Sequence, residues 1–150
     1  FYAIIGTMWT LKTLEELSTR QLHQIYKART EVFVVEQNCA YPEVDDLDLK
    51  ALHLFLENSG AVLAYCRLID CPNQVKLGRV LVVQAARKDG LGRSLVTKAL
   101  EICQENFPEK PIYAQAQTYL QDFYDFFGFK PISESYLEDG IPHIDMLLER

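Results

Sequence analysis

A single stretch of the 150-residue chain, residues 78–100, constrains the fold more than any other. It passes from a β-branched apolar run at residues 80–83 through the loop Arg87-Lys88-Asp89-Gly90-Leu91-Gly92 into a segment whose apolar residues recur every three or four positions. These patterns are typical of a buried strand, a tight loop and a helix with one apolar face. A strand that leads directly into a helix is the repeating unit of α/β proteins, so the stretch predicts an α/β fold.

The start of the predicted helix is suited to binding phosphate. The first turn of a helix leaves four N–H groups unpaired and carries a partial positive charge, and phosphates bind there readily. Gly90 and Gly92 have no Cβ to obstruct the approach, and Arg87, Lys88 and Arg93 add positive charge around the loop. A pyrophosphate therefore fits better than a single carboxylate. The alternative is a solvated basic turn, because short glycine motifs often occur without a ligand.

Two familiar nucleotide-binding patterns do not fit this loop. A P-loop requires Gly-Lys followed by Ser or Thr, and a Rossmann fingerprint requires a small residue where Leu95 stands. The spacing Arg87-x-x-Gly90-x-Gly92 instead resembles motif A of the GCN5-related N-acetyltransferases, the GNAT superfamily. By this resemblance the loop amides hold the pyrophosphate of coenzyme A, and the preceding strand lies along the pantetheine arm. Gln84 stands where many members have proline.

A second resemblance lies at residues 120–129, LQDFYDFFGF, which are similar to GNAT motif B. It implies that Tyr124 is the general acid that protonates the leaving coenzyme A thiolate. The pKa of a phenol is close enough to that of a thiol for the proton to pass when the two groups are in contact. Without the resemblance, Tyr124 would be one aromatic residue of a core helix. The two motifs imply acetyl-CoA as co-substrate and a cofactor site formed by Leu81, Val82, Val83, Arg87, Lys88, Asp89, Gly90, Leu91, Gly92, Arg93, Ser94, Gln115 and Phe123.

Further strings narrow the resemblance to the ElaA-type branch of the GNAT proteins. They are residues 32–39 (VFVVEQNC), 115–117 (QAQ) and 138–144 (EDGIPHI), together with GRV at 78–80. The branch has no well-defined acceptor. The resemblance therefore implies an N-acetyltransferase that acts on a primary amine of a small molecule or peptide, without naming that amine.

The predicted elements follow the order β α β β β α β α β β, which matches the GNAT fold along nearly the whole chain. We predict a mixed twisted sheet of six to seven strands flanked by helices on both faces. A capping box at Ser18 to Gln21 predicts a helix that ends near Gln37. The other predicted elements are strands at residues 8–13, 51–56, 61–70, from Val75, 112–117, 129–135 and 141–148, and helices at residues 90–105 and 119–127.

Length and composition indicate one domain, residues 1–150. The net charge of −6 argues against a nucleic-acid partner and favours a cationic acceptor, and no apolar run is long enough to cross a membrane. Four cysteines without metal-binding spacing indicate reduced thiols and no metal site. We expect a cytoplasmic protein. Residues 1–7 are expected to be an upstream extension or an expression remnant, with Met8 as a natural start.

Residues 38–50 carry the acids Glu43, Asp45, Asp46 and Asp48 and predict a polar loop or short irregular helix. Their spacing lacks the frame of a calcium-binding loop. A solvated loop is favoured over a role in attracting substrate. This segment and the carboxyl-terminal strands are where a homodimer contact or a wall of the substrate site would lie.

Acetyl transfer to an amine needs a base, because a lysine-like amine is almost wholly protonated at neutral pH. Many GNAT enzymes place a glutamate on the central strand, where this sequence has Gly78, Arg79 and Val80. We predict His143 as the base, with Glu36 as the second choice. Asp145, two residues beyond His143, would share its strand face. The remaining candidates are Glu43, His53 and Asp139, of which His53 equally fits a core histidine.

A backbone N–H at Val82 or Val83 is predicted to polarise the thioester carbonyl. The missing strand glutamate also leaves a second hypothesis open, a coenzyme A-binding sensor or interaction module without turnover. A third is a nucleotide-binding α/β domain, which ATP or NAD would stabilise where coenzyme A would not.

Overall fold

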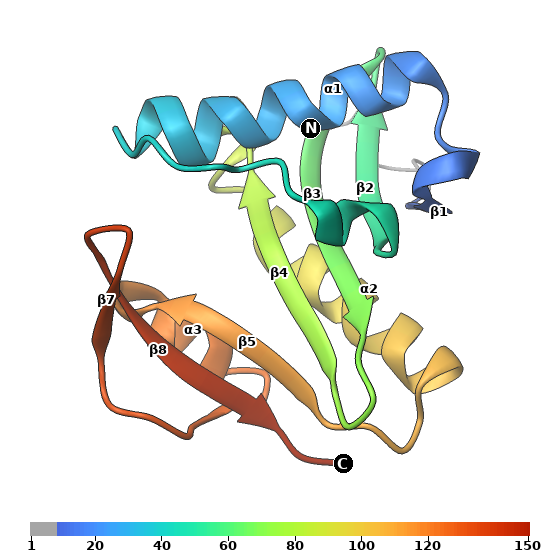
Figure 1. Cartoon of the computed structure of the whole chain (residues 1–150). Coiled ribbons are helices and arrows are strands. Elements are labelled where there is room, and N and C mark those ends of the chain that lie inside the picture. The colour runs from blue at the N-terminus through green and yellow to red at the C-terminus, as the bar shows by residue number, and fades with distance from the viewer. Residues whose placement is uncertain (1–8) are drawn as a thin grey trace.

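One mixed β-sheet with helices on both faces organises the structure, as the sequence predicts (Figure 1). The computed structural model describes residues 9–150, so the extension expected at residues 1–7 and the start expected at Met8 lie outside the described residues. The strands are β1 (Thr10–Thr13), β2 (Leu52–Asn58), β3 (Ala61–Asp70), β4 (Val75–Val82), β5 (Ile112–Gln117), β6 (Lys130–Pro131), β7 (Tyr136–Glu138) and β8 (Ile141–Leu148). The helices are α1 (Thr19–Arg29), α2 (Leu91–Asn106) and α3 (Gln121–Asp125), with a π-helix at Thr30–Glu36 and 3₁₀ turns at Leu14–Glu16, Asp46–Leu49, Gln84–Ala86 and Thr118–Leu120.

The strands lie in the order β1-β2-β3-β4-β5-β8-β6, and β7 pairs with β8. β4 and β5 run parallel and are joined by the crossover through α2, whereas the other neighbouring pairs in residues 9–150 are antiparallel. Figure 1 shows α1 above β2, β3 and β4, while β5 and β8 turn away from β4 as the strands leave their common end. The sheet therefore opens between β4 and β5.

Alternating side chains on the central strands build a core on each face of the sheet. Leu54 of β2 faces the core that contains Leu95 of α2. Phe55, the next residue, faces the opposite core with Ile25 of α1. The two-residue period of a strand produces this division. All four side chains are 0% exposed, and burying each one stabilises the fold by roughly 2 kcal/mol.

The first helix begins and ends where the sequence predicts. Its capping box is present, because the Ser18 hydroxyl accepts from the Gln21 N–H at 3.0 Å and the Gln21 side chain accepts from the Ser18 N–H at 3.0 Å. The last part, residues 30–36, is a π-helix and not an α-helix. π-helical segments are rare and occur frequently at functional sites, and this one borders the opening in the sheet.

The carboxyl-terminal hairpin differs from the prediction in detail. The strand predicted at residues 129–135 pairs with β8 only at Lys130 and Pro131, followed by one more backbone hydrogen bond from the Ile132 N–H to the Asp145 carbonyl at 2.8 Å. The connection predicted at residues 136–140 instead contains strand β7. Tyr136 holds β7 on β8 because its hydroxyl donates to Asp145. The sheet consequently has eight strands, two of them short.

The acidic segment 43–48 is not the solvated loop that the sequence predicted. Glu43 and Asp48 are 5% and 1% exposed. Arg29, at the end of α1 and itself 0% exposed, donates to Glu43 Oε2 at 2.6 Å and to Asp48 Oδ1 at 2.8 Å. The prediction was wrong because a buried carboxylate is stable once it meets a fixed cation, and that cation lies more than ten residues away in the sequence.

Two more arginines complete a buried ion cluster that links four segments of the chain. Arg67 of β3 donates to Asp45 Oδ1 at 2.7 Å and also binds Asp48. Arg79 of β4 donates to Glu43 Oε2 at 2.9 Å. The three guanidinium groups and three carboxylates of this cluster balance in charge. The segment that follows α1 is thereby fixed against β3 and β4. The members of the buried ion cluster are Arg29, Arg67, Arg79, Glu43, Asp45 and Asp48.

The cluster keeps Asp45 and Asp48 ionised. Burial by itself raises the pKa of Asp48, but the hydrogen bonds and charges of Arg29 and Arg67 outweigh it, so this pKa lies below its ordinary value. The pKa of Asp45 is lowered in the same way, mainly by Arg67. Burial opposes the charge of Arg29 too, yet the partners Asp48 and Glu43 raise its pKa. Both signs of charge therefore persist at neutral pH.

We expect Asp48→Asn to lower the free energy of unfolding by about 3 kcal/mol, because it leaves Arg29 and Arg67 buried without part of their counter-charge. Urea unfolding at pH 7 measures this change. Asp46→Asn is the matched control, since Asp46 is exposed in the same turn, and it should alter the free energy by no more than about 0.5 kcal/mol. Equal losses in the two variants would contradict the role given to the cluster.

The lowered carboxylate pKa values predict a loss of stability in acid. A carboxylate whose pKa is lower in the folded chain stabilises the fold above its unfolded pKa, about 4 for aspartate, and this contribution disappears as the pH falls through the folded value. We expect the free energy of unfolding to fall below about pH 4, and to fall less steeply in Asp48→Asn. Denaturant titrations at several pH values test this, and parallel curves for the two proteins would refute it.

Candidate active site

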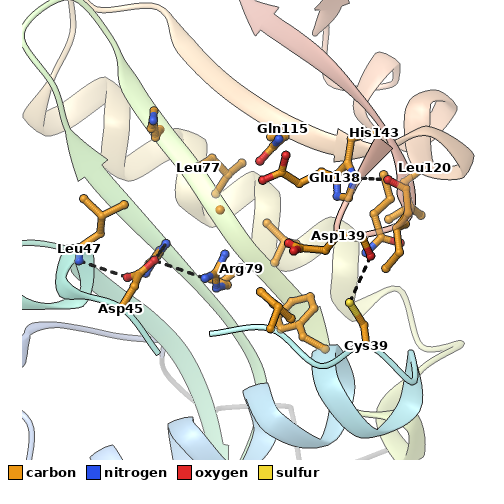
Figure 2. A pocket seen from close by; sticks show the side chains of 18 of the residues that line it. Cys39, Asp45, Leu47, Leu77, Arg79, Gln115, Leu120, Glu138, Asp139 and His143 are labelled. Atoms are coloured by element: carbon orange, nitrogen blue, oxygen red, sulfur yellow. Dashed lines mark hydrogen bonds and ion pairs between the residues drawn. The ribbon is translucent and has the colours of Figure 1, made fainter. Parts of the chain in front are cut away.

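β4 and β5 pair at only three positions, residues 75–77 against 112–114, and then separate. The opening continues into a cavity of about 660 Å³ bounded by β4, β5, the turn between β7 and β8, and the segment after α1. Figure 2 shows Leu77 and Arg79 on one side of this cavity and His143 on the other, with Gln115 between them. A cavity of this volume suits a small-molecule ligand.

The floor of the cavity is a polar row of side chains on β5. Ala114 and Ala116 point to the core beneath α2 and α3, whereas Tyr113, Gln115 and Gln117 alternate to the other face and line the cavity. Figure 1 shows α1 crossing over β2 to β4, so this face of β5 and β8 lies beside the helix and not beneath it. The two-residue period of β5 therefore serves a core and a polar site at the same time.

The glycine loop before α2 has the conformation expected of a ligand-binding turn. Gly90 is the N-cap residue of α2 with a φ of 74°, in the left-handed region, and it provides no side chain to cap the first N–H groups. A Cβ placed on Gly92 would lie 3.7 Å from the Phe123 ring and 3.8 Å from Val82. The helix start consequently packs close to both β4 and α3.

Most of the other residues predicted to bind the cofactor lie in or beside this turn, whereas Gln115 lies on β5 and lines the cavity. Leu91 is 3% exposed and its side chain packs in the core, so that side chain is not available to a ligand. The guanidinium of Arg93 lies 3.9 Å from the centroid of the Phe126 ring, and Gln115 donates from Nε2 to the Tyr136 hydroxyl at 2.8 Å. The side chains exposed to solvent on the loop and first turn are Lys88, Asp89, Arg93 and Ser94.

Arg87 and Glu36, predicted for phosphate binding and base catalysis, are paired with each other. Arg87 Nη1 and Nη2 donate to the two Glu36 carboxylate oxygens at 2.6 and 2.8 Å, and Arg87 Nε donates to the Val82 carbonyl at 2.9 Å. The hydrogen bond from Arg87 lowers the pKa of Glu36, which makes that carboxylate a weaker base. Glu36 also lies outside the lining of the cavity.

The two predicted donors to the thioester carbonyl differ in their surroundings. The N–H of Val83 donates to the Leu63 carbonyl at 2.9 Å, so it is already satisfied and that alternative was wrong. Alternate residues of a strand direct their N–H groups to opposite edges, so the N–H of Val82 points away from β3. That edge faces the opening beside β5.

Tyr124 of α3 lies between the core and the cavity. Its side chain is 5% exposed and lines the cavity. The ring packs edge-on against Phe123 and Phe129, with centroids 5.2 and 5.6 Å apart. Burial raises the pKa of the Tyr124 phenol, so the hydroxyl keeps its proton and remains a donor at neutral pH.

The imidazole of His143 is oriented from two sides. Its Nδ1 lies 2.7 Å from the Ile141 carbonyl oxygen, which can only accept, so Nδ1 carries the proton and Nε2 carries the lone pair of the neutral ring. The ring stacks on Tyr136 with centroids 6.4 Å apart, and the Tyr136 hydroxyl donates to Asp145. His143 and Asp145 therefore share one face, as predicted, and His143 lines the cavity.

Two other candidates for the base are occupied. His53 is 1% exposed, with Nδ1 2.6 Å from the Tyr65 hydroxyl and Nε2 3.1 Å from the Asp48 carbonyl. Burial lowers the pKa of His53. Because both of its ring nitrogens have hydrogen-bonding partners, His53 is a core histidine. Glu43 is held in the buried ion cluster. Asp139 lies in the turn between β7 and β8 and lines the cavity.

The roles of two arginines in the cavity wall were missed by sequence reasoning. Arg67 was not singled out, and Arg79 was noted for standing where many GNAT enzymes have a glutamate, whereas both bind the acidic segment and line the cavity. A usable signal was present, because Arg67 interrupts an otherwise apolar strand. A charged residue in a buried strand requires a partner of opposite charge.

Other site classes find no support in residues 9–150. Within that range no three side chains of His, Cys, Asp or Glu are grouped to hold a metal ion, and no helix is long and apolar enough to cross a membrane. The four cysteines are free thiols, and Cys66 and Cys103 are buried. Burial raises the pKa of the Cys103 thiol to about 11.

Diverging parallel strands, a glycine turn that opens a helix, and a cavity at the divergence define the fold of the acyl-CoA N-acyltransferases. The family model described as an acetyltransferase (GNAT) domain matches residues 14–150. A UPF0039 protein of Schizosaccharomyces pombe is 49% identical over 141 residues, which cover 92% of this chain and 94% of that protein. The ElaA protein of Escherichia coli is 44% identical over 139 residues, 89% of this chain and 91% of that protein. The chain belongs to the GNAT acetyltransferase family, in its ElaA-type branch.

Solved structures agree with this assignment. The crystal structure of Escherichia coli ElaA has a TM-score of 0.91 at 42% identity and covers 95% of this chain and 99% of that one. An acyl-CoA N-acyltransferase from Pseudomonas aeruginosa has a TM-score of 0.89 at 44% identity, with 94% and 99% covered. The predicted fold and branch are thereby confirmed.

Proposed function

We propose that this protein transfers the acetyl group of acetyl-CoA to a primary amine by direct attack in a ternary complex. One observation carries the proposal: Tyr124 and the lone-pair nitrogen of His143 line the same cavity, at the point where β4 and β5 separate. Membership of the family supports acyl transfer in general. The acetyl donor, the amine acceptor and the residue roles are the proposed part.

Coenzyme A would bind across the opening from the side of α2. Its pyrophosphate would accept hydrogen bonds from the first N–H groups of α2 beyond Gly90, where the helix dipole favours negative charge. The exposed Lys88 and Arg93 would add charge near the same phosphates. The pantetheine arm would follow residues 81–83 into the cavity, with Phe123 against the turn at Gly92.

The chemical step is an acyl substitution. The neutral amine nitrogen attacks the thioester carbonyl carbon, a C–N bond forms, and the C–S bond breaks with its electron pair left on sulfur. The N–H of Val82 is aimed to stabilise the negative charge that develops on the carbonyl oxygen. Before the attack, His143 Nε2 takes a proton from the bound ammonium group and releases it to solvent, which leaves the neutral amine. After the attack the nitrogen loses its second proton to His143, the thiolate gains a proton from Tyr124, and solvent returns both residues to their starting states.

Proton transfer from Tyr124 to the thiolate requires that the pKa values of the phenol and the thiol be similar, and both depend on the environment that the two groups share. Burial raises the pKa of the Tyr124 phenol, which by itself would weaken it as an acid. A thiolate formed in the same apolar surroundings has its pKa raised as well, as burial does for the thiol of Cys66. Burial therefore raises the pKa values of the phenol and the thiol together, and the proton passes as the C–S bond breaks.

Binding of acetyl-CoA should depend on the turn at Gly90. We expect Gly90→Ala to weaken the binding of acetyl-CoA by about tenfold in isothermal titration calorimetry, because φ of 74° is unfavourable for alanine and the turn must change to relieve it. Gly60→Ala is the matched control, with a φ of 82° and no atom within 4 Å of its Cβ. Loss of binding in both variants, or in neither, would oppose the proposed phosphate site.

Turnover should depend on Tyr124 and His143. We expect Tyr124→Phe and His143→Gln each to lower kcat by about 10²-fold or more in a thiol-release assay with a panel of amines, since each removes one proton transfer. The affinity for acetyl-CoA, measured in parallel by calorimetry, should change little.

Tyr119→Phe serves as the control, because Tyr119 is 76% exposed just before α3, and it should retain full activity. Saturable binding of acetyl-CoA without amine-dependent thiol release from any acceptor would instead support the sensor hypothesis, which the absence of a glutamate at residues 78–80 motivates.

A further inference from the structure

One buried donor in the cavity wall has no partner. Arg67 is 4% exposed and lines the cavity. Its Nη1 and Nη2 are bonded to Asp45 and Asp48, but its Nε is buried and makes no hydrogen bond in the described residues. A buried N–H without a partner is unfavourable, so Arg67 keeps an unused donor and its positive charge in the wall of the cavity.

The space beside this donor is left open by a glycine. Gly78 of β4 is the cross-strand partner of Arg67 and also lines the cavity. A Cβ placed on Gly78 would have no atom within 4 Å, so the position faces empty space and its φ requires no glycine. Directly opposite side chains on paired strands are neighbours. The missing side chain at residue 78 therefore leaves a cradle next to Arg67.

The charge around this cradle is positive. The buried ion cluster is balanced, with three arginines against three carboxylates. Lys76, two residues before Gly78 and on the same strand face, lines the cavity and contacts the ring of Tyr113 at 5.8 Å, with no carboxylate partner in the described residues. Arg79 adds a guanidinium whose side chain is 21% exposed. One positive charge therefore remains uncompensated at this end.

The opposite wall has the opposite sign. Glu138, the last residue of β7, and Asp139, in the turn that follows it, line the cavity without a cationic partner in the described residues, and Figure 2 shows them across from Arg79. His143, the proposed base, lies on the same side. Carboxylates next to the base would attract an ammonium group before it loses its proton. The cavity thus presents a negative wall and a positive wall to one molecule.

We infer that the acceptor is an amine that also carries an anionic group, a carboxylate or a phosphate, and that this anion occupies the cradle formed by Lys76, Arg67 and Gly78. The inference rests on the proposed function and names the substrate class for it. The amine end faces His143, while the anion is bound at the strand side of the cavity, so the two charges select both the acceptor and its orientation.

The test compares acceptors that differ only in the anion. Amino acids are compared with their C-terminal amides, and O-phosphoethanolamine with ethanolamine, by thiol release from acetyl-CoA. We expect Lys76→Gln to lower the ratio of kcat/KM for anionic over uncharged acceptors by about tenfold. Intrinsic differences in amine reactivity cancel when this ratio is compared between the two proteins. Lys27→Gln removes an exposed charge from α1, outside the cavity, and should leave the ratio unchanged.

A second variant tests the cradle itself. Gly78→Ala should raise KM for the preferred anionic acceptor at an unchanged melting temperature, because its Cβ meets no protein atom. The amino acids and their amides test for a carboxylate, and O-phosphoethanolamine and ethanolamine test for a phosphate, so the two pairs identify which anion the cradle binds. If Lys76→Gln and Lys27→Gln give the same ratio while amines are acetylated, the inference is overturned and the proposed function stands.

Binding separates the two remaining outcomes. The protein saturated with coenzyme A is melted with each acceptor pair. A melting temperature raised more by the anionic member, and an increment lost in Lys76→Gln, would uphold the anion site at Lys76 and Gly78 and, without acetylation of any amine, would overturn the proposed function alone. No turnover together with no anion-dependent increment would overturn both proposals.

Discussion

Parallel pairing between β4 and β5 stops after Leu77, and the rest of the candidate site depends on that break. Strand edges inside a fold carry N–H and C=O groups that need partners, so two edges that diverge create a place for a ligand's polar atoms. The ladder with β3 shifts register between Tyr65 and Arg67, and Arg79 opposite has a φ of 52°. Such bulges bend the strand that carries them, which directs β4 away from β5.

The buried ion cluster stabilises this irregular stretch of β4. A non-glycine residue in the left-handed region is strained by roughly 1–3 kcal/mol, and Arg79 offsets that strain by binding Glu43 and by stacking on the ring of Tyr41 at 5.6 Å. The same contacts fix the segment after α1, which forms a wall of the cavity. The ion pairs that link α1, β3, β4 and residues 43–48 therefore also determine the shape of this wall of the cavity.

Local patterns in the sequence were sufficient for most of the fold. The two-residue period of β2 to β5, the capping box at Ser18 and the glycine turn at Gly90 each depend on neighbouring residues, so they could be predicted. The errors arose where the deciding partner is distant. Glu36 meets Arg87 51 residues away and Glu43 meets Arg79 36 residues away, and no periodicity encodes those pairs.

The placement of the proposed base follows from the same distribution of charge. A carboxylate on β4 at residue 78 would lie beside Arg67, its cross-strand partner, and neighbouring positive charge lowers the pKa of a carboxylate and weakens it as a base. Glycine there leaves the arginine side of the cavity free for an anion. The base proposed on β8 would work from the opposite wall, where the Ile141 carbonyl fixes the tautomer of His143. The proposed base at His143 and the proposed cradle at Gly78 would therefore lie on opposite walls of the cavity, with the cradle beside Arg67 of β3 and Lys76 of β4.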